Sequence, residues 1–246
     1  MADFALAAVI LHYGRPEITK RLHRQLMESD PSWLQRIFVL DNHAPQPYPH
    51  AWQRLDSNLY WAGALDYCLR FFSSQGWSHV WFMNNDLYFV SPAPHLQRVW
   101  SRLQVMEKSI GPVGVYSPSF EQHPYHPQMV AVPGMAYRRA VFVDGVAPLI
   151  SLDCWRDVGG LDFQDNPYGY GVDVFFSWSA FRGGWPVIVD HEVRVRHVHH
   201  STARTIPGFL KIAASLEQAY LEQRLGPNYH NFLAQAKKDF TDEERL

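Results

Sequence analysis

Short apolar runs alternate with helical patterns over roughly the first 100 residues, and this alternation constrains the fold more than any other feature. Residues 4–11 (FALAAVIL) are continuously apolar, as expected for a strand buried on both faces. Residues 36–42 (RIFVLDN) and 79–86 (HVWFMNND) are further strand-like runs, and residues 17–27 and 58–76 contain apolar side chains at helical spacing. The alternation predicts a parallel sheet whose strands are joined by helices through right-handed crossovers.

Local signals mark the starts of two of the predicted helices. Residues 58–76 contain a turn that leads into a helix, with Asn58 as the candidate cap. Residues 91–106 (SPAPHLQRVWSRLQVM) begin another helix, with Ser91 as a candidate cap and Pro92 in the first turn.

The second half of the chain is less regular. Residues 113–120 and 129–143 are strand-like, and residues 172–189 predict a helix, a glycine stop and a strand. An amphipathic helix is predicted from 208 to 225, and the polar tail from 237 to 246 is expected to fray.

Composition and charge exclude several classes of protein. The net charge is −2 at pH 7 with acids and bases well mixed, so no basic stripe predicts nucleic-acid binding. The two cysteines, Cys68 and Cys154, are too few for a disulfide framework and fit a reducing compartment. The N-terminal residues carry an acid where a signal peptide needs bases, and no apolar run is long enough to cross a bilayer. We expect a cytoplasmic protein, and peripheral contact with the inner face of the membrane is left open.

Polar side chains follow three of the predicted strands. They are His12 and Tyr13, then Asp41 and Asn42, then Asn84, Asn85 and Asp86. In parallel sheets the ligand binds beyond the carboxyl ends of the strands. A carboxylate there can hold Mg²⁺ or Mn²⁺ against a diphosphate, and Asp86 is the charged candidate. Ordinary turns also favour Asn and Asp, so turn formation is an alternative explanation of the pattern.

The segment 166–176 (NPYGYGVDVFF) combines a glycine-containing loop with aromatic side chains and one acid near its end. Tyr168 and Tyr170 give the loop aromatic faces, and Asp173 enters an otherwise apolar helix. An acid at a helix N-terminus is stabilised by the helix dipole, which is one explanation for Asp173. The functional interpretation is a general base beside an aromatic platform.

A histidine cluster follows the last predicted strand, in the segment 196–201 (RHVHHS). Alternation along a strand places His197 and His199 on one face. They could bind a metal or a phosphate, or pack at the strand end, and their spacing matches no zinc motif.

Eight segments in the correct order resemble one known family. They are AAVILHYGRPE, IFVLDNHA, SNLYWAGALDYCL, VWFMNNDLYFVSP, LISLDCWRDVGGLDF, GYGVDVFFSWSAFRGGWPVIV, VRHVHHSTAR and YLEQRLGP. Together they resemble family 2 of the inverting, nucleotide-sugar-dependent glycosyltransferases, which have the GT-A fold. The resemblance spans almost the whole chain, and the order of the segments makes it stronger than any single motif.

The chain departs from the family pattern at three places. Tyr170 and Gly171 stand where the family often has Glu-Asp, which leaves Asp173 as the acid of that segment. Asn84 replaces the first Asp of the Asp-x-Asp metal motif, and Tyr60 stands where the family usually has Gly. The Gly-aromatic-Gly-x-acid pattern also resembles galactosyltransferase loops that end in a catalytic acid.

The resemblance implies an α/β fold of the GT-A type, with a Rossmann-like mixed central sheet flanked by helices. It places the transferase domain at residues 1–205, with a C-terminal helical extension at 206–246 packed on the same domain. Asp173 is then the general base, and Asp86 holds Mn²⁺ or Mg²⁺ on the donor diphosphate with His197 as a further ligand. The implied donor-binding residues are His12, Tyr13, Arg15, Asp41, Asn58, Trp61, Gly63, Asn84 and Asn85. The implied acceptor-binding residues are Tyr168, Tyr170 and Trp185.

The implied reaction moves a sugar, with inversion, from a nucleoside diphosphate sugar to a hydroxyl of a saccharide or lipid-linked saccharide. Bacterial surface polysaccharide synthesis is the implied setting, and the chain does not choose the nucleotide, the sugar or the acceptor. Two alternatives stay open. A GT-A-like nucleotidyltransferase would usually carry a glycine-rich basic loop after the first strand, where LHYGRPEITKR has one glycine. A non-catalytic sugar- or nucleotide-binding protein on the same fold is the other, because fold does not fix function.

Overall fold

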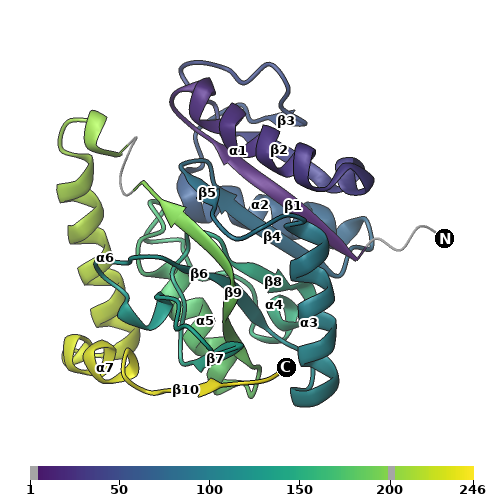
Figure 1. Ribbon diagram of the computed structural model, residues 1–246. Coiled ribbons are helices and arrows are strands. Elements are labelled where there is room, and N and C mark those ends of the chain that lie inside the picture. The colour runs from purple at the N-terminus through teal and green to yellow at the C-terminus, as the bar shows by residue number, and fades with distance from the viewer. Residues whose placement is uncertain (1–4, 199–202) are drawn as a thin grey trace.

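The computed structural model describes residues 5–198 and 203–246. The described strands form one mixed sheet in the order β10-β7-β9-β6-β8-β4-β1-β2-β3, and β5 pairs with β9 beside this path (Figure 1). Helices flank the sheet, so the predicted α/β fold with a mixed central sheet is confirmed. The strands are β1 (Leu6–His12), β2 (Ile37–Asp41), β3 (Gln53–Arg54), β4 (His79–Asn84), β5 (Leu87–Phe89), β6 (Val115–Phe120), β7 (Tyr137–Ala140), β8 (Leu149–Ser151), β9 (Val187–His197) and β10 (Phe240–Glu243).

Several strands of the sheet point the same way. β1 is parallel to β2 and β4, β6 is parallel to β9, and β8 runs antiparallel to both β4 and β6. The carboxyl ends of β1, β2, β4, β6 and β9 therefore lie along one edge of the sheet, which we call the carboxyl edge. The polar residues that follow these strands are brought to this edge, where ligands bind in open α/β sheets.

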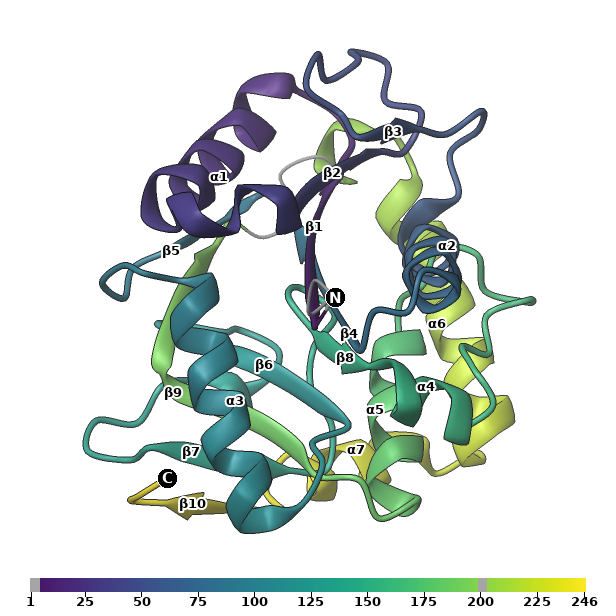
Figure 2. The same ribbon diagram turned by 90° about the vertical axis from the view of Figure 1, so that its right-hand side faces the viewer.

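Helices cover both faces of the sheet. Figure 2 shows α1 and α3 on one side and α2, α4, α5 and α6 on the other. Each long helix turns apolar side chains inward, as Leu22 and Leu26 do in α1 and Leu103 does in α3. The helices are α1 (Pro16–Ser29), α2 (Tyr60–Ser74), α3 (Leu96–Ile110), α4 (Leu152–Asp157), α5 (Val172–Arg182), α6 (Phe209–Leu225) and α7 (Tyr229–Ala236).

The start of α3 differs from the prediction. The helix begins at Leu96, so Ser91 is not its cap. Asp30, just after α1, accepts hydrogen bonds from the backbone N–H groups of residues 95–97 at 2.8, 3.1 and 3.0 Å. This remote carboxylate satisfies the free donors of the first turn, which a local cap would otherwise satisfy.

The prediction that the polar tail frays is wrong, because Phe240–Glu243 form the edge strand β10 against β7. Arg138 on β7 is buried and donates two hydrogen bonds to the carboxylate of Asp242, at 2.7 and 2.8 Å. It also donates to the carbonyl oxygen of Gln128 at 2.8 Å. The strand is thus stabilised by a partner 104 residues earlier in the chain.

We expect Arg138→Ala to lower the free energy of unfolding by about 1.5–3 kcal/mol, because it removes two charged hydrogen bonds to Asp242 and leaves that carboxylate only the contact with His191. Arg139→Ala is the matched control, since Arg139 pairs with Glu243 at 3.4 Å with both side chains exposed. The control should cost less than about 1 kcal/mol. Urea unfolding of both variants checks this, and equal losses would contradict the structural role given to Arg138.

Candidate active site

Asp86 and His197 meet at the carboxyl edge. β4 ends at Asn84, a tight turn follows, and β5 then pairs antiparallel with the end of β9, with Leu87 opposite His197. This pairing brings Oδ1 of Asp86 to 3.0 Å from Nε2 of His197. The two side chains are only 11% and 9% exposed. A carboxylate and an imidazole are therefore held together in a mostly buried position.

The 3.0 Å contact is a hydrogen bond between the two side chains, and the same donor types, a carboxylate and an imidazole, can also bind a divalent cation. Two adjacent ligands of an octahedral ion with bonds of about 2.1 Å lie about 3 Å apart, close to the observed separation. Within residues 5–198 and 203–246, no group of three or more His, Cys, Asp or Glu side chains is arranged to hold a metal. His199 and His200, from the predicted histidine cluster, lie outside the described residues. The pair would thus need ligands from substrate phosphates or water, as Mg²⁺ sites commonly do.

A second cluster at this edge was not predicted from the sequence. Nε2 of His123 and Nε2 of His126, in the loop after β6, lie 3.1 and 3.6 Å from Oδ2 of Asp144. Nδ1 of His123 accepts two backbone N–H groups, so the proton on this ring belongs on Nε2, which faces the carboxylate. Burial alone would raise the pKa of Asp144, but hydrogen bonding to His123 and the nearby imidazole charges outweigh it and lower the pKa.

Asp173 is the acid that begins α5, and its carboxyl is incompletely satisfied. Oδ2 accepts the backbone N–H of Gly145 at 2.6 Å, whereas the buried Oδ1 has no hydrogen-bond partner among the described residues. Burial, and after it the negative charge of Asp144, raises the pKa of Asp173 to about 8. The pKa of Asp144 is thus lowered while the pKa of the neighbouring Asp173 is raised, and such a divergence is common in acid–base sites.

Gly145 connects Asp173 to the start of α2. Its carbonyl oxygen accepts a hydrogen bond from Nε1 of Trp61 at 3.0 Å, while its N–H bonds to Asp173. A Cβ atom at Gly145 would lie 2.7 Å from the Trp61 ring and 3.0 Å from Asp173. Only glycine fits between these two side chains without displacing them.

Tyr170 lies within the electrostatic reach of several carboxyl groups. Burial, followed by the charges of Glu217, Asp144, Asp173 and Asp86, raises the pKa of Tyr170 to about 12. The phenol is therefore neutral over the physiological range and can donate a hydrogen bond. Tyr170 marks the place where the acids of the carboxyl edge come together.

An aromatic group closes the site on the side of α6. The ring of Tyr168 stacks on Tyr60 with centroids 4.5 Å apart and lies tilted against Phe209, at the start of α6, at 4.8 Å. Tyr60 has a left-handed backbone conformation with φ of 54°, which non-glycine residues rarely adopt. The stacked Tyr168 ring gives Tyr60 a contact that compensates for this conformation.

Several predicted donor-binding residues hold loops in place instead of offering free polar atoms. His12 and Asp41 are fully buried, and the protein occupies their polar atoms. Asn58 accepts hydrogen bonds from Asn42 at 2.9 Å and from the backbone N–H of Tyr60 at 2.8 Å. Asn85 is buried and donates to Thr19 at 2.8 Å. These contacts hold the loops of the carboxyl edge in place.

Tyr13, Arg15 and Asn84 remain partly or fully accessible at the same edge. Gly63 is buried inside α2, where an added Cβ would meet Leu59 at 3.0 Å, so its close contact is with the protein. The structure therefore divides the predicted donor residues into accessible ones and ones that support the loops.

Trp185 does not lie at the site. It precedes the first residue of β9, whereas His197 is the last, so the two lie at opposite edges of the sheet. Its indole donates to Asp157 at 2.8 Å and packs beside Gly114, near the start of β6. The assignment of Trp185 to acceptor binding is corrected, because Trp185 lies before the start of β9, at the edge of the sheet opposite His197.

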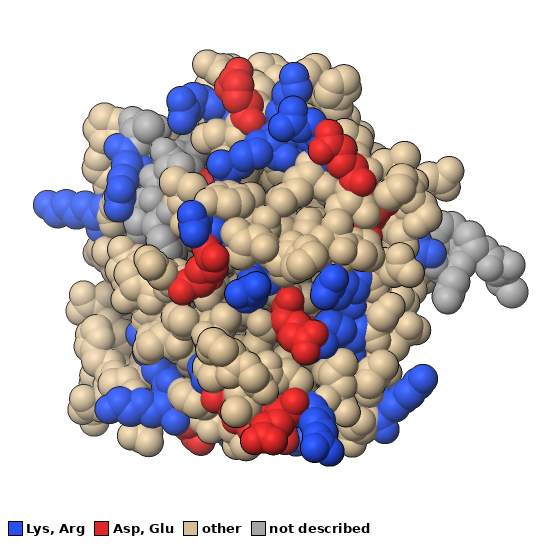
Figure 3. Space-filling view, in the orientation of Figure 1, with Lys and Arg blue, Asp and Glu red and all other residues tan. Residues whose placement is uncertain are grey.

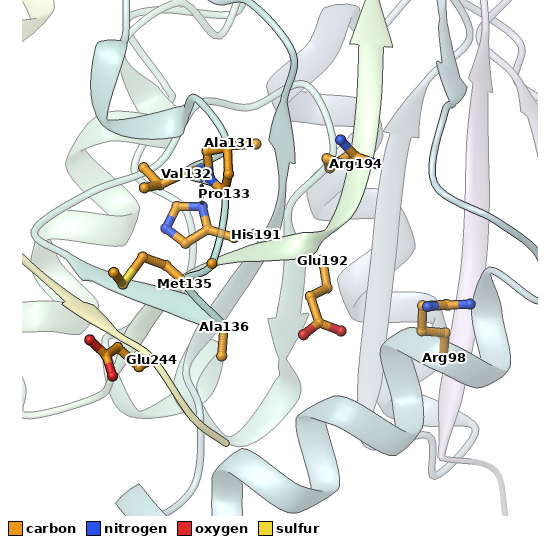
Figure 4. A pocket seen from close by; sticks show the side chains of 11 residues that line it. Arg98, Ala131, Val132, Pro133, Met135, Ala136, His191, Glu192, Arg194 and Glu244 are labelled. Atoms are coloured by element: carbon orange, nitrogen blue, oxygen red, sulfur yellow. Dashed lines mark hydrogen bonds between the residues drawn. The ribbon is translucent and has the colours of Figure 1, made fainter.

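A hollow of about 380 Å³ opens elsewhere, beside the middle of β9 (Figure 4). It is lined by the loop 131–136 together with Arg98, His191, Glu192, Arg194 and Glu244. On the face shown in Figure 3, basic and acidic side chains are interspersed. No helix in the described parts of the chain has the length and apolar character needed to cross a membrane.

Comparison with known proteins gives the fold. No family model matches the chain. The uncharacterized protein Rv1525 of Mycobacterium tuberculosis (strain ATCC 25618 / H37Rv) is 28% identical over 198 residues, which cover 78% of this chain and 74% of the relative. The uncharacterized protein Mb1552 of Mycobacterium bovis matches to the same extent. The crystal structure of GalNAc-T7 with UDP, GalNAc and Mn²⁺ has a TM-score of 0.56 at 10% identity, covering 78% of this chain and 43% of the GalNAc-T7 chain.

The chain has a GT-A-like, glycosyltransferase-like fold. It spans less than half of the GalNAc-T7 chain, so the likeness concerns the fold alone. The relatives with detectable sequence identity carry no described activity.

Asp173→Asn should stabilise the protein increasingly as the pH rises. The pKa of Asp173 is about 8 in the folded protein, against an ordinary value of 3.8. Between these two pH values the folded protein holds a proton on Asp173 that the unfolded chain has lost, so the folded state becomes less stable as the pH rises from about 3.8 to about 8. Asparagine mimics the protonated form and avoids the loss. We expect an advantage on the order of 1–3 kcal/mol at pH 8.5 that largely disappears at pH 4.5, measured by urea unfolding. Asp153→Asn, at a side chain 76% exposed, is the control and should show no such trend.

Proposed function

We propose that this protein is a glycosyltransferase that moves a sugar from a nucleoside diphosphate sugar to a hydroxyl of a saccharide acceptor. The observation that carries the proposal is the meeting of two features at the carboxyl edge of a GT-A-like sheet. One is the Asp86–His197 pair, with a separation suited to a divalent ion. The other is Asp173, a partly buried acid whose pKa is raised to about 8.

Asp86 and His197 would hold Mn²⁺ or Mg²⁺, and the imidazole favours Mn²⁺ of the two. The bound ion would supply charge neutralisation for the departing diphosphate. Asn84, Tyr13 and Arg15, the accessible groups at this edge, would contact the donor. The buried contacts of His12, Asp41, Asn58 and Asn85 would keep their loops in place.

Asp173 would act as the general base. As the acceptor oxygen attacks the anomeric carbon, its proton passes to the Asp173 carboxylate. The bond from the anomeric carbon to the diphosphate oxygen breaks, and the diphosphate leaves with the electron pair. A single displacement of this kind inverts the anomeric configuration. The raised pKa suits the role, because a general base works best when its pKa lies near the operating pH.

Donor binding gives the first test. We expect one of UDP, GDP and dTDP to bind in calorimetry with Mn²⁺ and to lose most of its affinity in EDTA. Asp86→Ala should abolish the metal-dependent part of the nucleotide affinity. Asp153→Ala, on the exposed surface, should leave that affinity unchanged. If folded wild-type protein binds none of these nucleotides, the donor site is wrongly assigned.

Turnover gives the second test. Asp173→Asn should lower kcat by about 10²–10⁴-fold while nucleotide affinity is retained, because it removes proton transfer but not the donor site. In wild type, kcat/KM should rise with pH and level off near pH 8, the pKa of Asp173. Nuclear magnetic resonance of the product should show inversion. Nucleotide binding without transfer or hydrolysis would favour the non-catalytic alternative, and retention would exclude the single displacement.

A further inference from the structure

Glu217 on α6 is an acid that the proposed reaction does not use. Its side chain is half-buried, and its carboxyl group has no hydrogen bond or ion pair with any other residue that the structure describes. Burial raises the pKa of Glu217, opposed by the positive charge of Lys237. The Glu217 oxygens are not among the buried unpartnered atoms, so the carboxyl group reaches solvent and can turn toward a ligand.

The position of Glu217 brings it to the loop that carries Tyr170. A Cβ atom at Gly171 would lie 3.3 Å from Cγ of Glu217 and 3.1 Å from Cγ of Leu221. Gly171 has φ of 81°, so a side chain there would also be strained. The bare backbone at Gly171 therefore gives α6 the room to bring Glu217 against the loop.

The negative charge of Glu217 also acts on residues of the candidate site. It is the charged group that raises the pKa of Tyr170 most, after burial, and it raises the pKa of Asp173 as well. Tyr170 is surrounded by the fields of Glu217, Asp144, Asp173 and Asp86. On the side of Tyr170 away from Asp86, the negative charge would repel a diphosphate. Hydroxyl groups could instead donate hydrogen bonds to the carboxyl oxygens on that side.

We propose that Glu217 binds the acceptor, accepting a hydrogen bond from a hydroxyl beside the one that reacts, and that the acceptor sugar is uncharged at this position. The proposal rests on the proposed function and names its acceptor class. The carboxylate of Glu217 disfavours uronic acids and other anionic sugars by like-charge repulsion. Glu217 is a binding and specificity residue, since Asp173 takes the proton.

The test compares Glu217→Gln and Glu217→Ala with Glu222→Gln, which changes an exposed acid on the same helix. Saturation-transfer magnetic resonance and titration, with nucleotide and Mn²⁺ present, would follow the binding of methyl galactoside, methyl glucoside, methyl rhamnoside and methyl galacturonoside. We expect wild type to bind a neutral glycoside better than the galacturonoside. Glu217→Ala should weaken neutral binding about 10- to 100-fold, as expected for a lost hydrogen bond to a charged group. Glu217→Gln should reduce the difference in affinity between the neutral glycosides and the galacturonoside. Glu222→Gln should bind both as wild type does.

The outcomes separate this inference from the proposed function. If nucleotide binds but the Glu217 variants bind glycosides as wild type does, the role of Glu217 is wrong and the donor site stands. A preference for the galacturonoside, or binding of no neutral glycoside beside a bound nucleotide, also overturns it. If wild type binds no nucleotide, the proposed function itself fails. Thermal unfolding gives an independent readout, because a structural role predicts a clear loss of Tm in Glu217→Gln and the binding role does not.

Discussion

The pairing of β5 with β9 is the contact on which the candidate site depends. β5 follows directly from the turn that carries Asp86, and β9 ends at His197, 111 residues later. In the main path of the sheet, the strands β1 to β4 and the strands β6, β7, β9 and β10 are joined through β8. The β5–β9 ladder adds a direct connection between these parts at the carboxyl edge. Without it, the carboxylate and the imidazole would belong to separate regions of the edge.

The second constraint is the concentration of acids around Tyr170. Asp144 is held by two imidazoles, Oδ1 of Asp173 is buried without a partner, and burial raises the pKa of the nearby Glu217. Acids that lie close together and are partly shielded from water destabilise a folded chain. Extensive burial of apolar side chains in the sheet and helices compensates for this, as is usual where a fold supports a strained or charged site.

Much of the fold could be predicted from the sequence because its signals are local. The apolar runs at β1, β2 and β4 are buried as expected, and α1 follows its helical spacing. The failures involve distant partners: Asp30 caps α3 from 65 residues away, and Arg138 orders the tail through Asp242. No local pattern contains such information.

The candidate site follows the same division. Asp86 and His197 were predicted together through the strand-end pattern and the family resemblance, and the structure brings them within 3.0 Å. Asp144 precedes Gly145, and Asp-Gly is an ordinary turn dipeptide, so nothing in the sequence singled it out. The pair His123 and His126 gave a weak signal, two histidines three residues apart in a proline-rich loop, but its carboxylate partner comes from a different loop. Trp185 was misplaced because sequence distance does not say at which end of a strand a residue lies.

The main chain of Gly145 links the starts of two helices, α2 and α5. Trp61 belongs to the first turn of α2, and Asp173 to the first turn of α5, and both bond to this one residue at 3.0 and 2.6 Å. The indole of Trp61 and the carboxyl group of Asp173 are therefore both anchored to the main chain of this residue, one at its carbonyl oxygen and one at its N–H. The first turns of α2 and α5, far apart in the chain, are thus held at a fixed spacing by one residue, and any side chain at position 145 would push them apart.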